Sequence, residues 1–528
     1  MRQKNFCAWG WADTAATRDE IRALEWAVGP MLGIKSFDVT PSPRPEEFKL
    51  RAPRLSAPAS LAPLLSFDHN ERLSHCYGQS FADLARVLAR DCPNPPDAVA
   101  FPRNESDVAH ILDFCANTGA VAIPYGGGTS VVGGIEAPPA ADCAITIDLR
   151  QLNGMLEVDT VSRTARIQGG TRGPDIEQQL KPHGLTLRHF MQSWEFSTLG
   201  GWIATRSGGH FASLATHIDD VVESIRAVAP AGIYESRRLP ASGAGPSPDR
   251  MLIGSEGILG VITEAWVRVH KQPVFRQSVS VRFADFIAGA AAVRAISQAG
   301  LYPANCRLLE AQEAAYTSTA TQGALLVLSF ESADHPVDAW MARALQLAAE
   351  AGGVWDAAEL ADKESHRGGA AGEWRAKFLR MPYFIEPLAA RGIMATTFES
   401  AITWDRFNDF RENVIAATRR AVKEITGSEG SLTCRLTHIY ADGPAPYFTL
   451  IAALDKRKML EQYVEIKRAA LDALVAHGGT VTHHHAVGRE HRSQYDRQRP
   501  ELFAQALRAA KRVFDPKAIL NPGVLIDP

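Results

Sequence analysis

Apolar residues recur at two different spacings along this chain, and each spacing predicts its own kind of element. Strict alternation of apolar and polar residues is typical of half-buried strands, and it marks a hairpin at residues 154–170 and a strand at 260–270. Apolar residues at helix spacing predict helices at 80–91 and 460–479, and a strand followed by a helix at 276–300. Helices that follow hairpins along one chain predict an α+β fold.

Capping and turn residues set the boundaries of several of these elements. Either Asn104 or Ser106 is placed to cap a helix that Gly119 then ends. The pair Ala231–Gly232 separates two apolar runs and predicts a hairpin. The turn at 441–446 likewise separates two strands in the second half of the chain.

The length of 528 residues predicts about three to four domain-sized units, because one hydrophobic core does not grow that large. A crop of prolines at 36–66 predicts an extended strap, and the polar, glycine-containing stretch 357–377 predicts a mobile helical insertion. The expected segments are an N-terminal strap and helical region (1–92), a glycine-rich domain (93–273), a second α+β domain (274–482) and a C-terminal segment (483–528).

Composition excludes several classes of protein. Hydrophobic residues make up 46% and charged residues 22%, which is ordinary for a globular protein, and the net charge of -3 gives no electrostatic case for binding nucleic acid or an anionic membrane. The seven cysteines form no CxxC pair, so neither a zinc site nor a disulfide framework is indicated, and free thiols in a reducing cytoplasm are expected. Neither a signal peptide nor a membrane span is recognisable.

Three glycine-rich stretches, 124–134, 197–209 and 254–260, carry the clearest chemical signal. Glycine lets the backbone approach a ligand closely, and successive bare N–H groups can bind an anion. One such stretch alone is equally consistent with a tight turn that binds nothing. The chain has no GxxxxGK[ST] phosphate loop, and the strand–GxGxxG–helix order of a Rossmann site is missing. Three separated glycine loops among hairpins therefore indicate a long, doubly phosphorylated ligand, and FAD fits.

Seven motifs of this sequence resemble those of a known family. The motifs are "WGWAD" (9–13), "CPNPPDAVAFP" (92–102), "PYGGGTSVVGG" (124–134), "SWEFSTLGGWIATRSGG" (193–209), "GSEGILGVITEA" (254–265), "RLLEAQE" (307–313) and "THHHAVG" (482–488). They resemble the FAD-binding superfamily of vanillyl-alcohol oxidase and p-cresol methylhydroxylase, and within it the alkyldihydroxyacetonephosphate synthase (alkylglycerone-phosphate synthase) branch.

The resemblance implies a two-lobed FAD-binding domain of the p-cresol methylhydroxylase type, a substrate cap with an antiparallel sheet, and a C-terminal segment that returns to the FAD domain. No His or Cys stands where a covalent flavin link is expected, so the FAD is expected to be non-covalent. The cofactor residues that the resemblance implies are Pro124, Tyr125, Gly126, Gly127, Gly128, Thr129, Ser130, Gln192, Ser193, Ser197, Thr198, Thr205, Arg206, Ser207, Gly208, Gly254, Ser255, Glu256, Gly257, Gly260 and Ile262.

The resemblance also implies catalytic residues in the cap. Tyr447 matches the family's acid–base tyrosine, although a tyrosine before an apolar strand is by composition more often a packing residue. Arg307 matches an arginine near the flavin, where a cation stabilises developing negative charge; otherwise it would be a surface residue at a strand end. His438 matches a histidine beside the site, and strand alternation predicts that Arg435 faces the opposite side.

The triplet His483, His484 and His485 matches a family triplet that lines the active site, where imidazoles could orient a leaving carboxylate or bind phosphate; a solvated polar loop is the plain alternative. Alternation in an extended segment turns His484 away from its two neighbours. No metal is expected, because Tyr447 and His484 replace the His and Glu of the metal-dependent dehydrogenases in the superfamily.

One position departs from the synthase pattern. The family's phosphate-binding arginine corresponds to Ile385, which offers a phosphate dianion no cation. Either Arg380 or Arg391 takes its place, or the substrate is not dihydroxyacetone phosphate. The loop that contains His210 and Phe211 also differs from the usual synthase loop.

These residues leave three functions open. The first is a synthase-like enzyme that uses a flavin adduct to exchange the acyl group of acyl-dihydroxyacetone phosphate for an alkyl alcohol, with no net redox change, in the formation of ether-lipid precursors. The second is an FAD-linked oxidase or dehydrogenase of a 2-hydroxy acid or alcohol. The third, a flavin-storing scaffold, leaves the polar residues of the cap without a role. The expected partner is a small molecule, lipid-like or a hydroxy acid; the resemblance implies a homodimer and leaves a peripheral membrane contact open.

Overall fold

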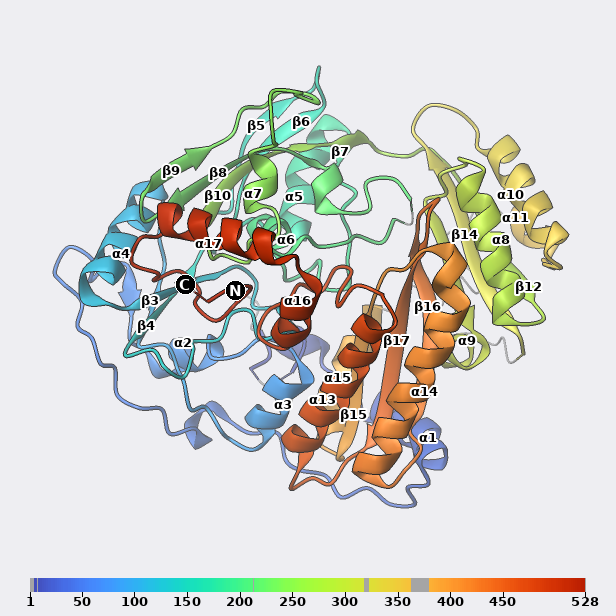
Figure 1. The fold of residues 1–528 in the computed structure, drawn as a ribbon, viewed down its shortest axis with the longest axis horizontal. Helices are drawn as coiled ribbons and strands as arrows, with labels where there is room; N and C mark the ends of the chain where they lie inside the picture. The colour runs from blue at the N-terminus through green and yellow to red at the C-terminus, as the bar shows by residue number, and fades with distance from the viewer. Residues whose placement is uncertain (1–3, 7, 212, 318–321, 362–378, 528) are drawn as a thin grey trace. The chain divides into compact units, whose positions relative to one another are not determined.

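The computed structural model describes residues 4–6, 8–211, 213–317, 322–361 and 379–527, and groups the chain into two compact units (Figure 1). Unit 1 contains Met1–Pro41, Gly209–Thr216 and Lys271–His483. Unit 2 contains Ser42–Gly208, His217–His270 and His484–Pro528. The helices and antiparallel sheets of both units confirm the α+β class. The division into four segments stays a prediction.

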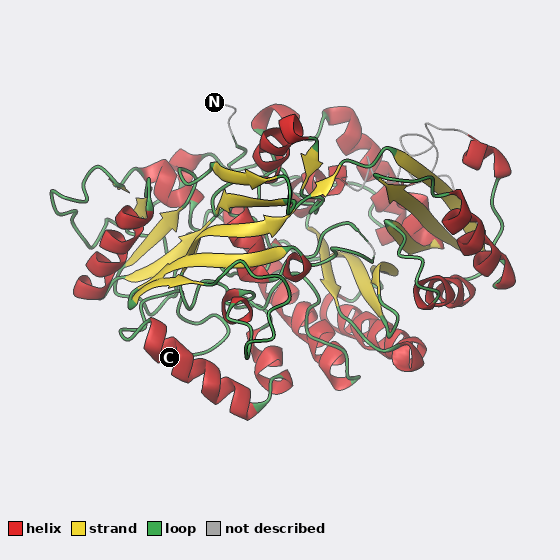
Figure 2. Ribbon diagram, turned by 90° about the horizontal axis from the view of Figure 1, so that it is seen from above, coloured by secondary structure: helices red, strands yellow, loops and turns green. Residues whose placement is uncertain are grey.

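Unit 2 is built on two principal sheets. The first has the order β1-β2-β4-β3, in which β2 (Ala98–Ala100) and β3 (Val121–Tyr125) pair in parallel with β4 (Ala144–Asp148) and β1 (Leu65–Ser66) pairs antiparallel with β2. The second is antiparallel, with the order β5-β6-β10-β8-β9, and Figure 2 shows its long strands as yellow arrows. Its strands are β5 (Met155–Asp159), β6 (Thr164–Gln168), β10 (Val261–Arg268), β8 (Val222–Ala229) and β9 (Gly232–Glu235). The predicted hairpins are therefore confirmed, as β5–β6 and β8–β9.

Unit 2 has eight described α-helices, and the capping residues predicted for one of them, α4, are tested by the structure. They are α2 (His69–Ser74), α3 (Phe81–Leu88), α4 (Glu105–Thr118), α5 (Gly173–Leu180), α6 (Leu199–Thr205), α7 (Asp249–Leu252), α16 (Arg492–Gln498) and α17 (Glu501–Phe514). Of the two cap candidates for α4, the structure selects Asn104, whose side chain accepts a hydrogen bond from the N–H of Asp107 at 2.9 Å. Gly119 ends the helix with φ +75°. Two short strands, β7 (Leu185–Thr186) and β11 (His270–Lys271), pair with each other in a separate two-stranded sheet.

The core of unit 2 lies between α4 and the first sheet. Ile111 and Leu112 of the helix pack there with Ile145 and Ile147 of β4, all of them buried. The C-terminal tail joins this core, because the N–H of Ala122 donates to the carbonyl of Ile519 at 2.8 Å. The tail is thus part of the same packed unit as β3, the strand that leads into the first glycine-rich stretch.

One prediction about the cysteines is wrong. Cys76, after α2, and Cys92, after α3, form a disulfide, because α3 turns the chain back and brings their Cα atoms to 6.9 Å. A separation of 16 residues belongs to no recognised motif, so no spacing pattern indicates this pair. Four further described cysteines are free and buried, and Cys7 lies outside the described residues.

Unit 1 is built on one six-stranded sheet with the order β12-β14-β13-β16-β17-β15, in which every neighbouring pair is antiparallel. The strands are β12 (Phe275–Phe283), β14 (Ala324–Ser332), β13 (Asn305–Glu310), β16 (Ser431–Ile439), β17 (Pro444–Ala453) and β15 (Ile393–Glu399). A turn separates β16 from β17 as predicted, but residues 444–446 of the predicted turn already belong to β17. This is the antiparallel sheet that the resemblance implies for the substrate cap.

Helices pack on the sheet of unit 1 through their apolar faces. They are α1 (Arg18–Leu32), α8 (Phe286–Gln298), α9 (Ala311–Thr317), α10 (Asp338–Glu350), α11 (Ala357–Ala361), α13 (Ile385–Ala389), α14 (Phe407–Thr426) and α15 (Met459–Ala476). The long helices α14 and α15 lie side by side (Figure 1). Residues 357–361 of the predicted insertion form α11, and 362–378 lie outside the described residues. Within the described chain, every helix is too short or too polar to cross a bilayer.

Candidate FAD site and the polar face of the cap sheet

The cofactor residues that the resemblance implies fall mainly into four stretches, 124–130, 192–198, 205–208 and 254–260. The first of these packs so closely against the second that side chains would not fit. A Cβ on Gly127 would lie 1.9 Å from the carbonyl oxygen of Phe196, and a Cβ on Gly126 would lie 2.2 Å from Oγ1 of Thr198. Gly128 has φ +69°, a conformation that other residues rarely adopt. These glycines are required for the close approach of two segments that lie about 70 residues apart in the sequence.

The third and fourth stretches meet in the same way. Gly254 has φ +80°, and a Cβ there would lie 2.6 Å from Cδ of Arg206, which itself ends α6 in the left-handed conformation. Gly257 has φ +77°, and a Cβ there would lie 3.0 Å from Cγ of Pro124, so the fourth stretch packs on the first. Thr198 caps α6 at its start by accepting from the N–H of Gly201. The four stretches therefore form one continuous backbone surface inside unit 2.

This surface has the chemistry that FAD requires. Backbone N–H groups without an intervening Cβ suit a pyrophosphate, and the hydroxyls of Ser and Thr in the stretches offer further hydrogen bonds. A Cβ at any of residues 126–128 would collide with Thr198, Phe196 or Tyr125, so the shape of this loop depends on its glycines. The residues present therefore fit the cofactor that the sequence indicated.

Glu256 ties the fourth stretch to the C-terminal segment. Its buried carboxylate accepts hydrogen bonds from the N–H groups of Val487 and Gly488, both at 2.8 Å. Burial raises the pKa of Glu256 to about 7, and the two N–H donors oppose this shift. Within unit 2, His484 and His485 precede this contact in the chain, with ring centroids 4.6 Å apart.

Sequence reasoning missed one buried histidine beside the third stretch. Nε2 of His189 lies 2.9 Å from Oγ of Ser207, and its ring meets the edge of Trp202 at 5.3 Å. Burial lowers the pKa of His189 to about 3, so the ring is neutral. A lone histidine in an irregular stretch carries no spacing signal that would have singled it out.

In unit 1, one face of the sheet collects the polar side chains that the sequence singled out. Tyr447 on β17 stands directly opposite Arg435 on β16 and Glu399 on β15, and directly paired residues on neighbouring strands point to the same face. All three side chains are buried. Arg307, two residues before Leu309, joins this face because Leu309 pairs with Arg435.

A β-bulge places His438 on the same face and overturns one prediction. The pairs Arg435–Tyr447 and Leu436–Pro446 are followed by His438–Ala445, so Thr437 is an extra residue on β16. The extra residue restores His438 to the side that Arg435 occupies. Simple alternation had placed Arg435 and His438 on opposite sides, and that prediction is wrong for this physical reason.

Tyr447 is held as a protonated phenol. Its hydroxyl donates to Oγ1 of Thr397 at 3.0 Å, and the guanidinium of Arg435 lies 4.0 Å from the centroid of its ring. Burial raises the pKa of Tyr447, and the charge of Arg435 acts in the opposite direction. The group is thus a proton donor at neutral pH, with a cation against its ring.

Arg307 is buried, so the alternative of a surface arginine is excluded. Its Nη2 lies 3.5 Å from Nδ1 of His210, and Nε2 of His438 lies 2.6 Å from the carbonyl oxygen of Gly209. Burial, and then the neighbouring charge of Arg435, lower the pKa of Arg307 to about 9, so the side chain stays a cation at neutral pH. The segment 209–216, which departs from the synthase pattern, belongs to unit 1 and contacts this cationic face.

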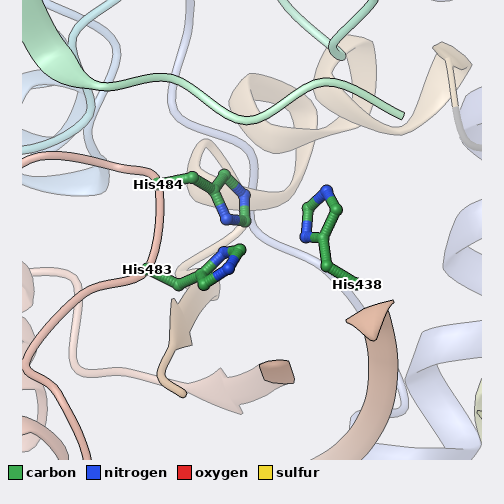
Figure 3. Close-up of side chains that lie close together, drawn as sticks. All are labelled: His438, His483 and His484. Carbon is green, nitrogen blue, oxygen red and sulfur yellow. The ribbon is translucent and has the colours of Figure 1, made fainter. Parts of the chain in front are cut away.

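His483 stands beside His438 (Figure 3), and the centroids of the two rings are 4.9 Å apart. The hydroxyl of Tyr440 lies 2.8 Å from Nε2 of His483, and the backbone N–H of His483 donates to the carboxylate of Glu399. Four of the predicted catalytic residues therefore lie in one unit around one sheet face: Arg307, His438, Tyr447 and His483. Their catalytic roles stay predictions.

The two candidate replacements for the missing phosphate anchor both form ion pairs with carboxylates on α1. Arg380 contacts the carboxylate of Glu20 at 2.9 and 2.8 Å, and Arg391 contacts that of Glu25 at 2.7 Å. The ion pair with Arg380 lowers the pKa of Glu20 to about 2. Ile385 itself opens α13. A phosphate would have to displace a carboxylate to use either arginine.

Comparison with known proteins agrees with this geometry. The model of the FAD binding domain matches residues 96–236, and that of the C-terminal domain of FAD linked oxidases matches residues 272–525. The alkyldihydroxyacetonephosphate synthase of Trypanosoma brucei brucei is 30% identical over 88% of this chain and 78% of its own length, and that of Dictyostelium discoideum is 29% identical over 94% and 83%.

A solved structure of an alkyldihydroxyacetonephosphate synthase matches the fold with a TM-score of 0.81, covering 98% of both chains at 24% identity.

Proposed function

The chain belongs to the alkyldihydroxyacetonephosphate synthase family of FAD-dependent enzymes, and from that premise we propose that it exchanges the acyl group of an acylated dihydroxyacetone substrate for an alkyl alcohol. The reaction releases a carboxylate, takes up the alcohol and returns its proton, so it involves no net redox change. Its product would be an ether-linked lipid precursor. A homodimer and a cytoplasmic location stay predictions of the sequence.

The observation that carries this proposal is the buried, protonated Tyr447 between a hydroxyl and a cation. Bound FAD supplies an electrophilic, electron-accepting ring. Tyr447 would exchange a proton with the substrate carbon or oxygen that reacts there. Arg307 would stabilise the negative charge that develops, because a fixed cation in a buried site needs no reorganisation during the reaction. His438 and His483 would orient the leaving carboxylate.

A second candidate function follows from the missing phosphate anchor. Arg380 and Arg391 are paired with Glu20 and Glu25, and Ile385 offers no charge, so this segment favours a substrate without a phosphate group. Oxidation of a 2-hydroxy acid or alcohol by FAD would need a proton acceptor and a cation for the carboxylate. Arg307 could supply the cation, whereas Tyr447 could accept a proton only as its phenolate.

The test that separates the two functions is an anaerobic visible spectrum of the purified holoenzyme. Acylated dihydroxyacetone phosphate plus a long-chain alcohol should release a fatty acid and leave the oxidised flavin band in place at the end. Bleaching of that band by a panel of D-2-hydroxy acids or alcohols would instead support the redox function.

Tyr447→Phe should retain the yellow cofactor and lose turnover, whichever substrate is found. Tyr463→Phe is the matched control, since Tyr463 is equally buried but lies in α15 away from the sheet pairing of Tyr447. Normal turnover by Tyr447→Phe would show that the role assigned to this tyrosine is wrong.

A further inference from the structure

The contact between Arg435 and Tyr447 is built into the fold and does not depend on a flexible side chain. The two residues are directly paired on neighbouring strands, and only 3% of Arg435 and 7% of Tyr447 is exposed. The guanidinium lies over the ring, 4.0 Å from its centroid, and Nη1 is also 3.4 Å from Oγ1 of Thr449. A cation over an aromatic face is attracted by the ring, and more strongly when water is excluded.

Glu313 on α9 fixes that guanidinium from the other side. Its Oε1 accepts from Nη1 of Arg435, and its Oε2 accepts from the hydroxyl of Thr433 at 2.5 Å. A buried charge is costly without a partner, so this carboxylate allows Arg435 to stay charged beside the phenol. Thr433 is on the same strand as Arg435, two residues away, and therefore on the same face.

We propose that Arg435, neutralised in part by Glu313, is a positioning residue that sets the proton affinity of Tyr447. This inference rests on the proposed acid–base role of Tyr447. The cation favours the phenolate that forms when the proton leaves, and the carboxylate limits how far it does so. The phenol therefore keeps its proton in the resting enzyme, and Arg435 lowers the cost of releasing it.

The charged groups that face Tyr447 come from four elements of unit 1. Arg435 on β16 and Arg307 on β13 favour the phenolate, whereas Glu399 on β15 and Glu313 on α9 oppose it. Thr397 on β15 accepts the hydroxyl's hydrogen bond. Removal of Arg435 would leave two carboxylates without this cation, and removal of Glu313 would leave the cation without its nearest carboxylate.

The two removals should thus shift the pKa of Tyr447 in opposite directions. We would label the holoenzyme with 3,5-difluorotyrosine, because fluorination lowers the pKa of a phenol into a range that a folded protein tolerates. The chain has ten tyrosines, and the ¹⁹F resonance that Tyr447→Phe removes is that of Tyr447. Arg435→Gln should raise its titration midpoint by about one pH unit or more, and Glu313→Gln should lower it, on the scale typical of a charge within about 4–6 Å.

The double variant Arg435→Gln with Glu313→Gln removes both charges and should titrate between the two single variants, and it keeps the test open if a lone buried charge prevents folding. Arg435→Lys should restore part of the wild-type midpoint. An unchanged midpoint in Arg435→Gln, or shifts of the same sign in both single variants, would overturn the proposal, since mere loosening of the site has no reason to follow the sign of the charge. Normal turnover by Tyr447→Phe would instead overturn the proposed function and leave these titrations as they are.

Discussion

Replacement of Gly127 by alanine tests whether the glycine-rich loop holds FAD by close backbone approach. The added Cβ would lie 1.9 Å from the carbonyl oxygen of Phe196 and 2.7 Å from its carbon, whereas real Cβ contacts are essentially never under 3.0 Å. The neighbour is backbone, so relief requires the two segments to separate by about 1 Å, more than a side-chain rotation can supply. Overpacking of this kind costs about 1–3 kcal/mol. If that cost falls on the bound state, FAD binds about 5- to 150-fold more weakly.

The assay is a titration of the apoprotein with FAD, followed by visible absorbance and by the FAD-dependent rise in melting temperature. Gly201→Ala is the matched control, because Gly201 lies inside α6 and the nearest atom to an added Cβ, Oγ1 of Thr198, is 3.4 Å away. Alanine there should bind FAD normally and stabilise the helix by up to about 1 kcal/mol. Wild-type FAD affinity in Gly127→Ala would refute the argument that the close packing of this loop on Phe196 shapes the FAD site.

Three further predictions concern unit 2. The pKa of His189 is near 3 in the folded state and about 6.5 in the unfolded state. As the pH falls below about 6.5, the unfolded chain binds a proton at this residue and the folded protein does not, so stability is lost. His189→Gln should therefore weaken by about 2 kcal/mol the loss seen between pH 7 and pH 5 in urea unfolding; equal losses in both proteins would contradict it. Thiol titration of the denatured, unreduced protein should find five of the seven cysteines, and all seven after reduction of Cys76–Cys92; seven before reduction would exclude the disulfide. Asp515→Asn removes the 2.6 Å partner of the buried Lys511 and should cost about 3–5 kcal/mol of unfolding free energy, with a loss below 1 kcal/mol counting against the pair.

The parts of the structure that the sequence predicts well are those set by neighbours in the chain. Alternation and turn residues identify the hairpins β5–β6 and β8–β9, because such pairs are closed by short local loops. Glycine-rich stretches identify the cofactor loops, because glycine is the residue that lacks a Cβ and so marks positions where a Cβ would not fit. The contacts among those loops are a different matter: Gly127 meets Phe196 across 69 residues, and only the resemblance brought the stretches together in advance.

The ion pairs of α1 were beyond the reach of any local pattern. Arg380 and Glu20 are 360 residues apart in sequence, and a charged residue on a helix is more often solvated than paired. The sequence raised the correct question about a missing phosphate anchor at Ile385. It offered Arg380 and Arg391 as substitutes because nothing near them in the chain shows that both contact carboxylates on the N-terminal helix.

On the polar face of the cap sheet, one inserted residue makes the prediction from strand alternation wrong. Strand alternation separates Arg435 from His438, and the rule holds on β17, where Tyr447 and Ala445 share a face. A bulge at Thr437 adds one residue to β16 alone, which no propensity in "CRLTHIY" announces, because a bulge is defined by the partner strand. That single insertion brings His438 onto the face that already holds Arg435 and Tyr447. The chemistry of the cap therefore depends on how β16 and β17 pair, a property of two strands together that neither segment carries alone.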